Sequence, residues 1–276
     1  MARTPTVALL TDFGYEDTYV GVVKSVILSR RPDCRFIDLS HAVAPQSVRE
    51  AAYLAWTAHR YLPSGTVLLC VVDPGVGTER RAMAATWPRG AFVGPDNGWL
   101  SFILQEAGAT PTDGRARLPE GWRAVELTNS DLWLTPLSDT FHGRDIFAPV
   151  AARLAAGDPL EDAGTPCDEL VAFSSSPKRS GDGTVTGEIL HVDHFGNLIT
   201  NITAFDLPES FTVQVAGGSV SGPARSYQSD APLVALVGSS GLLEVGAPNG
   251  SAGRLLRASV GDPISVTPKV PASVSS

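Results

Sequence analysis

The stretch "GTVLLCVVDPGVGTERR", from Gly65 to Arg81, decides the fold class. Its first half is an almost unbroken apolar run, which is typical of a strand buried on both faces of a parallel sheet. The run ends in Asp73, and a carboxylate at such a place is costly unless it is paired or hydrogen-bonded. We therefore predict an α/β fold with a mostly parallel sheet, and we expect Arg80 to be the partner of Asp73.

The turn that follows differs from a phosphate-binding loop, because its glycines are not followed by Gly-Lys-Ser or Gly-Lys-Thr. Gly75 and Gly77 permit a positive φ or the close approach of a substrate, although an ordinary tight turn also explains them. A surface ion pair would explain Arg80 equally well. Neither explanation accounts for Asp73 at the end of so apolar a run.

Strand-like and helix-like segments alternate around this stretch, which is the pattern of an α/β domain. A smaller all-β domain, an antiparallel barrel or sandwich, is predicted after it, because short alternating strands follow without long helical patterns. These expected strands cover 185–193, 198–203, 211–215, 233–246 and 262–268. The expected boundaries are an α/β domain over 1–168, a linker over 169–182, a β domain over 183–270 and a disordered tail over 271–276. In the first domain the expected strands cover 6–10, 35–40, 65–73 and the start of 91–100, and the expected helices cover 17–31, 45–62 and 145–157.

The composition argues against several classes of function. The net charge is −8 over 276 residues, whereas a protein that binds a nucleic-acid backbone normally has a basic face. No apolar run approaches the roughly 18 residues that span a bilayer, and the first residues lack a signal-peptide cleavage site. Cys34, Cys70 and Cys167 have neither disulfide nor zinc-site spacing. We expect a cytoplasmic protein that binds a small molecule, and no metal ion, nucleic acid or membrane.

Two acidic residues in "TDFGYED" follow the first expected strand. Asp12 can cap a helix or close a turn, or its carboxylate can accept hydrogen bonds from a vicinal diol such as a ribose. Asp17 can contact a cationic amine or cap the next helix. The sequence leaves these alternatives open.

Among the five histidines, His142 in "DTFHGRDIF" is the candidate for chemistry. We expect its small neighbour, Gly143, to leave the imidazole accessible. A lone histidine is more often a structural group, and His59 is expected on the exposed face of a helix.

A fourth cluster lies in "HVDHFGNLITN", where Asp193, Phe195 and Asn197 alternate. If this segment is a strand, the three side chains share one face. They would then form either a cross-strand patch or a purine subsite next to an anchor for an amine.

Together these clusters resemble the S-adenosyl-L-methionine hydroxide adenosyltransferase family, which is related to the fluorinase and chlorinase. The resemblance implies an N-terminal α/β domain and a C-terminal β domain, associated as a homotrimer with active sites between neighbouring subunits. It implies S-adenosyl-L-methionine as substrate, adenosine and L-methionine as products, and no cofactor. Five motifs in sequence order carry it: "LLTDFGYEDTYVGVVKSVI", "VVDPGVGTERR", "FVGPDNGWL", "DTFHGRDIFAP" and "VDHFGNLITNI".

The resemblance also implies roles for individual residues. Asp12 would hold the ribose hydroxyls, and Asp17 and Asp193 would face the methionine ammonium. Asn197 would bind the adenine edge beside Phe195. The remaining implied substrate-binding residues are Tyr227, which would stack on adenine, Ser239, Asn97 and Asn249. Ser240 lies where the halogenases offer an arginine to the methionine carboxylate.

Asp73, Arg80 and His142 match the triad that characterises the hydrolase branch. The resemblance implies that they position water or hydroxide in line with the bond between C5′ and sulfur. Within that arrangement we infer that Asp73 accepts a hydrogen bond or the proton, that Arg80 fixes Asp73 and stabilises negative charge, and that His142 is a second base or an orienting group. A halide about 4 Å from an ionised carboxylate would be repelled by roughly 4 kcal/mol at an effective dielectric near 20. Arg80 would cancel part of this repulsion, so these residues favour hydrolysis without excluding halide. The alternatives are a chlorinase, expected to lack the triad and to have a small hydroxyl residue in place of Gly143, and a non-catalytic nucleoside-binding or sensing module.

Overall fold

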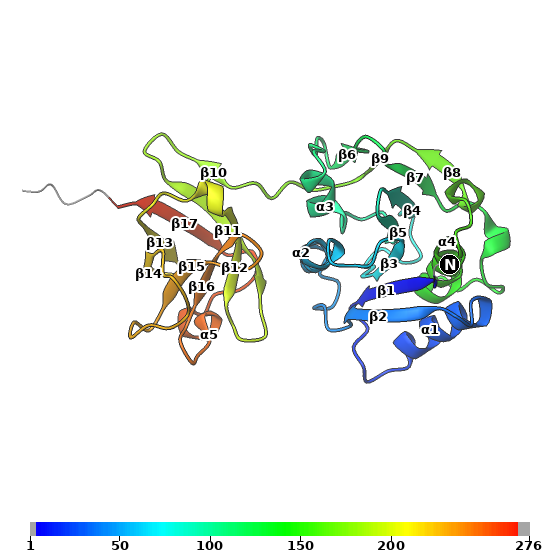
Figure 1. The fold of residues 1–276 in the computed structure, drawn as a ribbon, viewed down its shortest axis with the longest axis horizontal. Coiled ribbons are helices and arrows are strands. Elements are labelled where there is room, and N and C mark those ends of the chain that lie inside the picture. Colours follow the sequence, from blue (N-terminus) through cyan, green and yellow to red (C-terminus); the bar gives the residue numbers. More distant parts are fainter. Residues whose placement is uncertain (1–3, 270–276) are drawn as a thin grey trace, which may run out of the picture. The chain divides into compact units, whose positions relative to one another are not determined.

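The computed structural model describes residues 4–269. The chain separates into two compact units, Met1–Ser174 and Ser175–Ser276, and Figure 1 shows the elements of each. The first is an α/β unit and the second is an antiparallel β unit, which confirms the predicted fold classes. The tail predicted over 271–276 lies outside the described residues.

A seven-stranded sheet forms the centre of the first unit, in the order β2-β1-β3-β5-β4-β7-β8. The first four strands in this order are parallel, and β4, β7 and β8 extend the sheet through antiparallel pairs that the sequence pattern did not predict. Every residue of β3 is buried, as its apolar run predicts. The strands are β1 (Thr6–Thr11), β2 (Arg35–Ser40), β3 (Thr66–Val71), β4 (Ala82–Trp87), β5 (Gly90–Pro95), β7 (Arg123–Glu126) and β8 (Thr165–Cys167).

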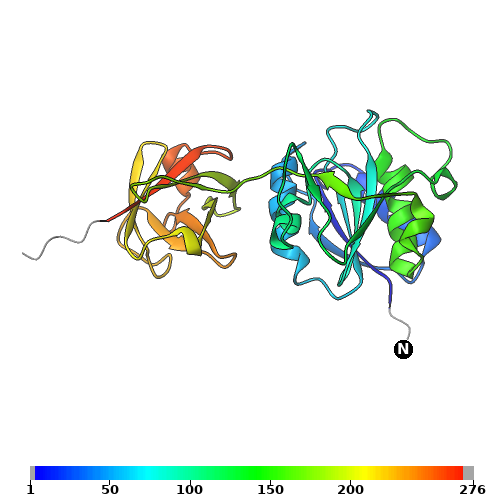
Figure 2. The ribbon, with the colours of Figure 1, turned by 90° about the horizontal axis from the view of Figure 1, so that it is seen from above.

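Helices cover both faces of this sheet (Figure 2). Leu9 of β1 packs in one core with Val23 of α1 and with α4, while the next residue, Leu10, packs in the other core with Ala55 of α2 and with α3. Gly157 ends α4 with a φ of 92°, as predicted for a glycine that follows a helix. The helices are α1 (Tyr19–Arg30), α2 (Val48–His59), α3 (Ser101–Glu106) and α4 (Ala148–Ala156).

The expectation of an exposed His59 is wrong, because its side chain is buried at the end of α2. The imidazole Nδ1 donates to the carbonyl of Trp56 at 2.7 Å, and the ring packs against Trp87 of β4. Burial lowers the pKa of His59. The sequence did not indicate this burial, because one partner, Trp87, lies on β4, a strand that was not predicted.

The second unit is an antiparallel, nearly closed barrel in the order β14-β13-β17-β11-β12-β16-β15, with β10 paired to β11. The amide of Ala224, just after β14, donates to the carbonyl of Ala235 in β15 at 2.7 Å and so connects the two ends of this order. Strands were predicted at all of these positions except β10 and β14. Their bounds are β10 (Lys178–Arg179), β11 (Val185–Val192), β12 (Leu198–Thr203), β13 (Phe211–Val215), β14 (Gly218–Gly222), β15 (Val234–Val237), β16 (Leu242–Gly246) and β17 (Pro263–Pro268).

The segment predicted as a linker, 169–182, is partly strand. Its first residues form β9 (Glu169–Val171), which pairs with β6 (Arg115–Arg117) in the first unit. β10 belongs to the second unit. Residues 172–177 and 180–182 are not strand and match the expected loop.

Candidate active site

The Asp73 turn follows β3 directly, at the edge of the sheet where the parallel strands end. Gly77 has a φ of 74°, and a Cβ at this position would lie 2.4 Å from the backbone oxygen of Asp139. Glycine is therefore needed here twice, for the left-handed backbone and for the close approach of a second loop. That second loop leads to His142. The close approach that Gly77 permits is therefore made by the backbone of Asp139 and not by a substrate.

Asp73 and Arg80 form the expected ion pair, and it is largely withdrawn from solvent. The side chain of Asp73 is 6% exposed and that of Arg80 is 11% exposed. Arg80 Nε donates to Oδ1 at 2.9 Å and to Oδ2 at 3.1 Å, and Nη2 donates to Oδ2 at 2.5 Å. The guanidinium also lies over the ring of Phe147, 5.3 Å from its centroid. A two-nitrogen contact of this kind fixes both partners in orientation as well as in charge.

His142 joins this pair through the same guanidinium. Nη2 of Arg80 lies 2.8 Å from Nδ1 of His142. Because a guanidinium only donates, Nδ1 is the acceptor, and the neutral ring carries its proton on Nε2. Burial, and then the positive charge of Arg80, lower the pKa of His142, which favours this neutral form. The structure therefore brings all three predicted catalytic residues together.

Gly143 begins a five-residue π-helix, Gly143–Phe147, which continues into α4. A Cβ on Gly143 would lie 3.1 Å from a methyl carbon of Val71 and 3.4 Å from the rings of Phe13 and Phe141. The small residue thus allows this helix to pack tightly against the end of β3. Gly143 has a packing role, in addition to any effect on the access of solvent to His142.

Asp12 lies one residue past β1, at the same edge of the sheet. Its Oδ2 accepts the backbone N–H of Gln46 at 2.8 Å, so it fixes the loop between β2 and α2. It does not cap α1, which begins after Thr18. Asp17 is exposed and lies just before that N-cap residue. Of the alternatives left open for Asp12, the structure supports a role in closing a loop.

Asn97 follows β5 and connects the ends of two neighbouring strands. Its Nδ2 donates to the carbonyl of Val72 at 2.9 Å, and its Oδ1 accepts the amide of Trp99 at 3.4 Å. Both ends of the side-chain amide therefore contact backbone. Asn97 holds the peptide that precedes Asp73, which places it beside the triad.

Sequence reasoning missed a hydrogen-bonded series beneath the Asp12 turn, which runs from buried His41 and Thr11 to the partly exposed Asp38 and Lys24. His41 is 1% exposed, and its Nδ1 lies 2.8 Å from the hydroxyl of Thr11, which also accepts the amide of Phe13 at 3.3 Å. On its other side, Nε2 lies 3.0 Å from Asp38, which is paired with Lys24 at 2.7 Å. Each member has a partner, so the series stabilises the conformation of the turn. No motif in the sequence joins residues so far apart.

In the second unit, the cluster of Asp193, Phe195 and Asn197 is a turn between β11 and β12, so the strand interpretation is wrong. Asp193 Oδ1 accepts the amides of Phe195 and Asn197 at 2.9 and 2.8 Å, and its Oδ2 accepts Nδ2 of Asn197 at 2.9 Å. Gly196 has a φ of 84°, which a strand does not allow. Asp193 therefore builds the turn, while Phe195 is 73% exposed.

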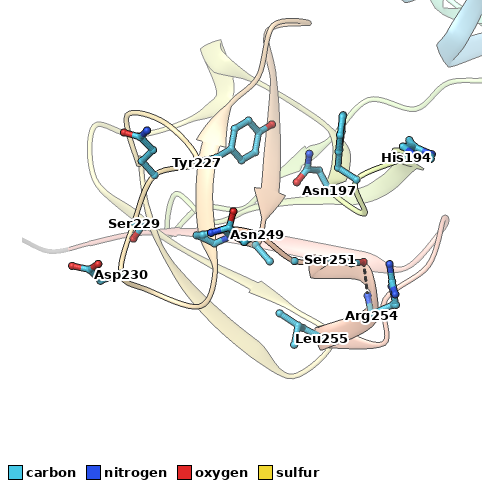
Figure 3. A pocket seen from close by; sticks show the side chains of 14 residues that line it. His194, Asn197, Tyr227, Ser229, Asp230, Asn249, Ser251, Arg254 and Leu255 are labelled. Atoms are coloured by element: carbon cyan, nitrogen blue, oxygen red, sulfur yellow. Dashed lines mark hydrogen bonds between the residues drawn. The ribbon is translucent and has the colours of Figure 1, made fainter.

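An open cavity of about 1330 Å³ lies beside this turn (Figure 3). Four predicted substrate-binding residues contribute to its wall: Phe195, Asn197, Tyr227 and Asn249. Ser239 does not line it and is exposed in the turn between β15 and β16. The next residue, Ser240, has a buried hydroxyl without a hydrogen-bond partner among the residues described here.

Ser251 and Arg254 are among the residues of the cavity wall that were not predicted. Ser251 caps the short helix α5 (Ala252–Leu256), because its hydroxyl accepts the amide of Arg254 at 3.2 Å. The side chain of Arg254 is exposed and lines the cavity. The capping serine in "PNGSAG" was the available sequence signal, since a serine before a helical segment is typical of a helix start.

Within residues 4–269, no three His, Cys, Asp or Glu side chains come together as a group that could hold a metal ion. None of the helices in this part of the chain is long and apolar enough to cross a membrane.

Comparison with known proteins connects both units to one family. Residues 7–164 match the SAM hydroxide adenosyltransferase N-terminal domain, and residues 187–265 match the C-terminal domain of the same family. The (R)-S-adenosyl-L-methionine hydrolase of Thermus thermophilus is 43% identical over 94% of this chain and 98% of its own length. That of Salinispora arenicola is 40% identical over 97% of this chain and 99% of its own. Fluorinases are more distant relatives.

A solved structure has the same fold. The crystal structure of an uncharacterized conserved protein from Thermotoga maritima superposes with a TM-score of 0.83 at 35% identity, covering 95% of this chain and all of that one. The domain matches and the full-length relatives agree with the motifs found in the sequence. This chain belongs to the SAM hydroxide adenosyltransferase family.

Proposed function

We propose that this protein hydrolyses S-adenosyl-L-methionine to adenosine and L-methionine by in-line attack of water on C5′ of the ribose. The observation that carries the proposal is the hydrogen-bonded series of Asp73, Arg80 and His142 beside the end of β3. Relatives at 40 to 43% identity that are named as (R)-S-adenosyl-L-methionine hydrolases support the substrate and the reaction.

The chemistry places its main demand on the nucleophile. The water oxygen forms a bond to C5′, the bond between C5′ and sulfur breaks, and its electron pair stays on sulfur as the neutral thioether of methionine. The leaving group needs no acid, because a positive sulfonium becomes neutral. Water must lose one proton, so a base and exact positioning of the oxygen are the required contributions.

The contacts of Arg80 divide these roles. His142 Nδ1 is occupied by Arg80, so the neutral ring can offer only its Nε2 hydrogen, which would orient the water oxygen by donating to it. Asp73 is left as the group that takes the proton, through lone pairs that Arg80 does not use. Arg80 holds both groups in place and stabilises the developing charge. These contacts support Asp73 over His142 as the base.

The electrostatic argument against halide is weaker in the structure than in the sequence. Arg80 contacts both oxygens of Asp73 at 2.5 to 3.1 Å, so a nearby anion meets an ion pair and not an isolated carboxylate. Preference for water would then depend on the Nε2 hydrogen of His142 and the lone pairs of Asp73. Water can accept a hydrogen bond from the first and donate one to the second, whereas a halide ion can only accept.

For substrate binding we propose the roles implied by the family. Asp12 would hold the ribose, and Asp17 would face the methionine ammonium. Asn197, Phe195, Tyr227 and Asn249 would hold the base, because they line one cavity. Asp193 builds their turn, because its two oxygens accept three N–H groups, and it would also face the methionine ammonium. Ser239 and Asn97 complete the set.

We further propose that the enzyme works without a cofactor, as a homotrimer in the cytoplasm. A reaction with a neutral leaving group supports the first point, because no Lewis acid is needed to release methionine. Turnover that survives dialysis against a chelator would agree with it. Light scattering during size-exclusion chromatography measures the mass of the assembly, and a mass other than three chains would contradict the trimer.

The deciding experiment uses oxygen-18 water containing chloride and bromide, with identification of the nucleoside product by mass. Adenosine labelled at the 5′ oxygen, together with free methionine, is the expected result. A 5′-halogenated nucleoside would show that the protein is a halogenase and not a hydrolase. Intact substrate with measurable binding would indicate a nucleoside-binding module.

A further inference from the structure

Glu244 is a buried carboxylate that the reaction described above does not use. It lies in the middle of β16, opposite Ile199 of β12 and Leu236 of β15, and is 7% exposed. The hydroxyl of Tyr227 donates to its Oε2. Burial raises the pKa of this carboxyl group, and the bond from Tyr227 opposes that shift. No Lys or Arg side chain is paired with it among the described residues.

Two glycines make room for this pair of side chains. A Cβ on Gly238 would lie 1.7 Å from Oε1 of Glu244, so the carboxylate occupies the place where a side chain would be. A Cβ on Gly246 would lie 2.8 Å from the ring of Tyr227 and equally close to Oδ1 of Asn197. The ring is therefore held at both ends, by Gly246 beneath it and by Glu244 at its hydroxyl.

This arrangement decides what Tyr227 offers to the cavity that it lines. Its hydroxyl is directed to Glu244, so the surface available to a ligand is the aromatic ring. Oδ1 of Asn197 lies beside that ring, because Nδ2 of the same amide is bonded to Asp193. Figure 3 shows Tyr227 and Asn197 near each other in the cavity wall. A stacking surface and a hydrogen-bond acceptor are thus fixed next to each other.

We propose that Glu244 is a positioning residue for the base subsite, and that it acts by holding the ring of Tyr227 against Gly246 and beside Asn197. The inference rests on the proposed function in that it takes the ligand of this cavity to be the adenine of a nucleoside. A leucine at this position would pack in the barrel without desolvating a charge. A carboxylate at this position instead accepts the hydroxyl of Tyr227 and so fixes the orientation of its ring.

The test compares adenosine affinity, measured by calorimetry, with kcat and KM for S-adenosyl-L-methionine in four variants. Tyr227→Phe keeps the ring and removes only the hydroxyl, while Glu244→Leu removes the acceptor. Glu244→Gln keeps an acceptor oxygen, and the fourth variant combines Tyr227→Phe with Glu244→Leu. Glu188→Leu is the matched control, because Glu188 is a half-buried carboxylate of β11 that accepts a hydroxyl, from Ser175 at 2.6 Å, and does not line the cavity.

We expect Tyr227→Phe and Glu244→Leu each to weaken adenosine binding and raise KM by about fivefold to tenfold, with a smaller effect on kcat, as for the loss of one buried contact. The double variant should bind adenosine no more weakly than the more impaired of the two single variants. Each single substitution already removes the same hydrogen bond. Glu244→Gln should stay within about threefold of the unmodified protein. Thermal melting of each variant verifies that it is folded.

Three outcomes would overturn the inference. Tyr227→Phe could bind adenosine like the unmodified protein, the two single effects could add, or Glu188→Leu could lose as much affinity as Glu244→Leu. An unmodified protein that binds adenosine but releases no methionine would refute the proposed reaction alone, and the binding cycle would still decide the role of Glu244. A protein that binds neither adenosine nor S-adenosyl-L-methionine would refute both.

Discussion

Nη2 of Arg80 lies 2.8 Å from Nδ1 of His142 while it also donates to Asp73. One guanidinium nitrogen thus fixes the tautomer of the histidine and the orientation of the carboxylate together. Removing Arg80 would release both groups, whereas removing either partner would leave the other held.

The pH dependence of His142 follows from its contacts. Burial and the charge of Arg80 lower its pKa in the folded protein, so the ring stays neutral further into the acid range than an ordinary histidine, whose pKa is about 6.5. Protonation of Nδ1 would break the bond from Arg80. We therefore expect kcat/KM to fall only below pH 6.5, and folding stability to decrease as the pH drops below 6.5, because the unfolded chain binds the proton more readily. NMR titration of His142, identified by comparison with His142→Asn, measures this, and a pKa at or above 6.5 would contradict it.

Replacing the base should affect turnover more than binding. Asp73→Asn keeps the size of the side chain but removes its ability to take a proton, so we expect kcat to fall by about 10² to 10⁴ with little change in the dissociation constant of the substrate. The control is Asp96→Asn, since Asp96 is also a buried carboxylate, 2% exposed and paired with the neighbouring Arg81. That variant should melt at a lower temperature and keep kcat within about twofold. Equal losses of kcat in both variants would show that the Asp73 effect is structural.

The two acids after β1 should be distinguishable by ligand. Asp12→Ala should raise the dissociation constants of S-adenosyl-L-methionine and adenosine by about the same factor, because both ligands contain the ribose. Asp17→Ala should weaken only S-adenosyl-L-methionine, which carries the ammonium group. We expect about tenfold for each, as for a hydrogen bond to a charged group. Calorimetry with both ligands decides, and unchanged affinity in Asp12→Ala would remove that residue from the ribose site.

Gly77 should tolerate no side chain. Gly77→Ala adds a methyl group that would lie 2.4 Å from the Asp139 carbonyl, at a φ of 74°. Gly108→Ala is a matched control, because Gly108 has a φ of 93° and nothing within 4 Å of a Cβ. The control should lose about 1 kcal/mol from backbone strain alone, while Gly77→Ala should lose more and also reduce kcat. Chemical denaturation measures both, and equal destabilisation would show that the clash is relieved without cost.

The sequence predicted those features that depend on local pattern. The apolar run of β3 indicated a buried parallel strand, and the acid at its end indicated a partner, which is Arg80. β4 and β14 were missed, because neither has the continuous apolar run or clear alternation that predicts a strand. The turn at Asp193 was misread, because alternating residue types look alike in a strand and in a turn closed by a carboxylate.

Long-range contacts account for the remaining differences. Glu244 in "LLEVG" looks like the solvent-facing residue of an alternating strand, yet it is buried and accepts the hydroxyl of Tyr227 from another loop. His41 likewise connects Thr11 to Asp38 across the ends of two strands. Such pairings depend on the folded topology, and one sequence contains no local signal for them.

The contact of Gly77 with the Asp139 backbone has a thermodynamic consequence for catalysis. The loops that carry Arg80 and His142 are already docked on each other when the chain is folded, so their ordering entropy is supplied by folding and not by the arrival of the substrate. The affinity for the substrate can then be used to bring C5′ into line with the attacking oxygen. A rigid reaction centre of this kind should exchange its backbone amides slowly with or without ligand.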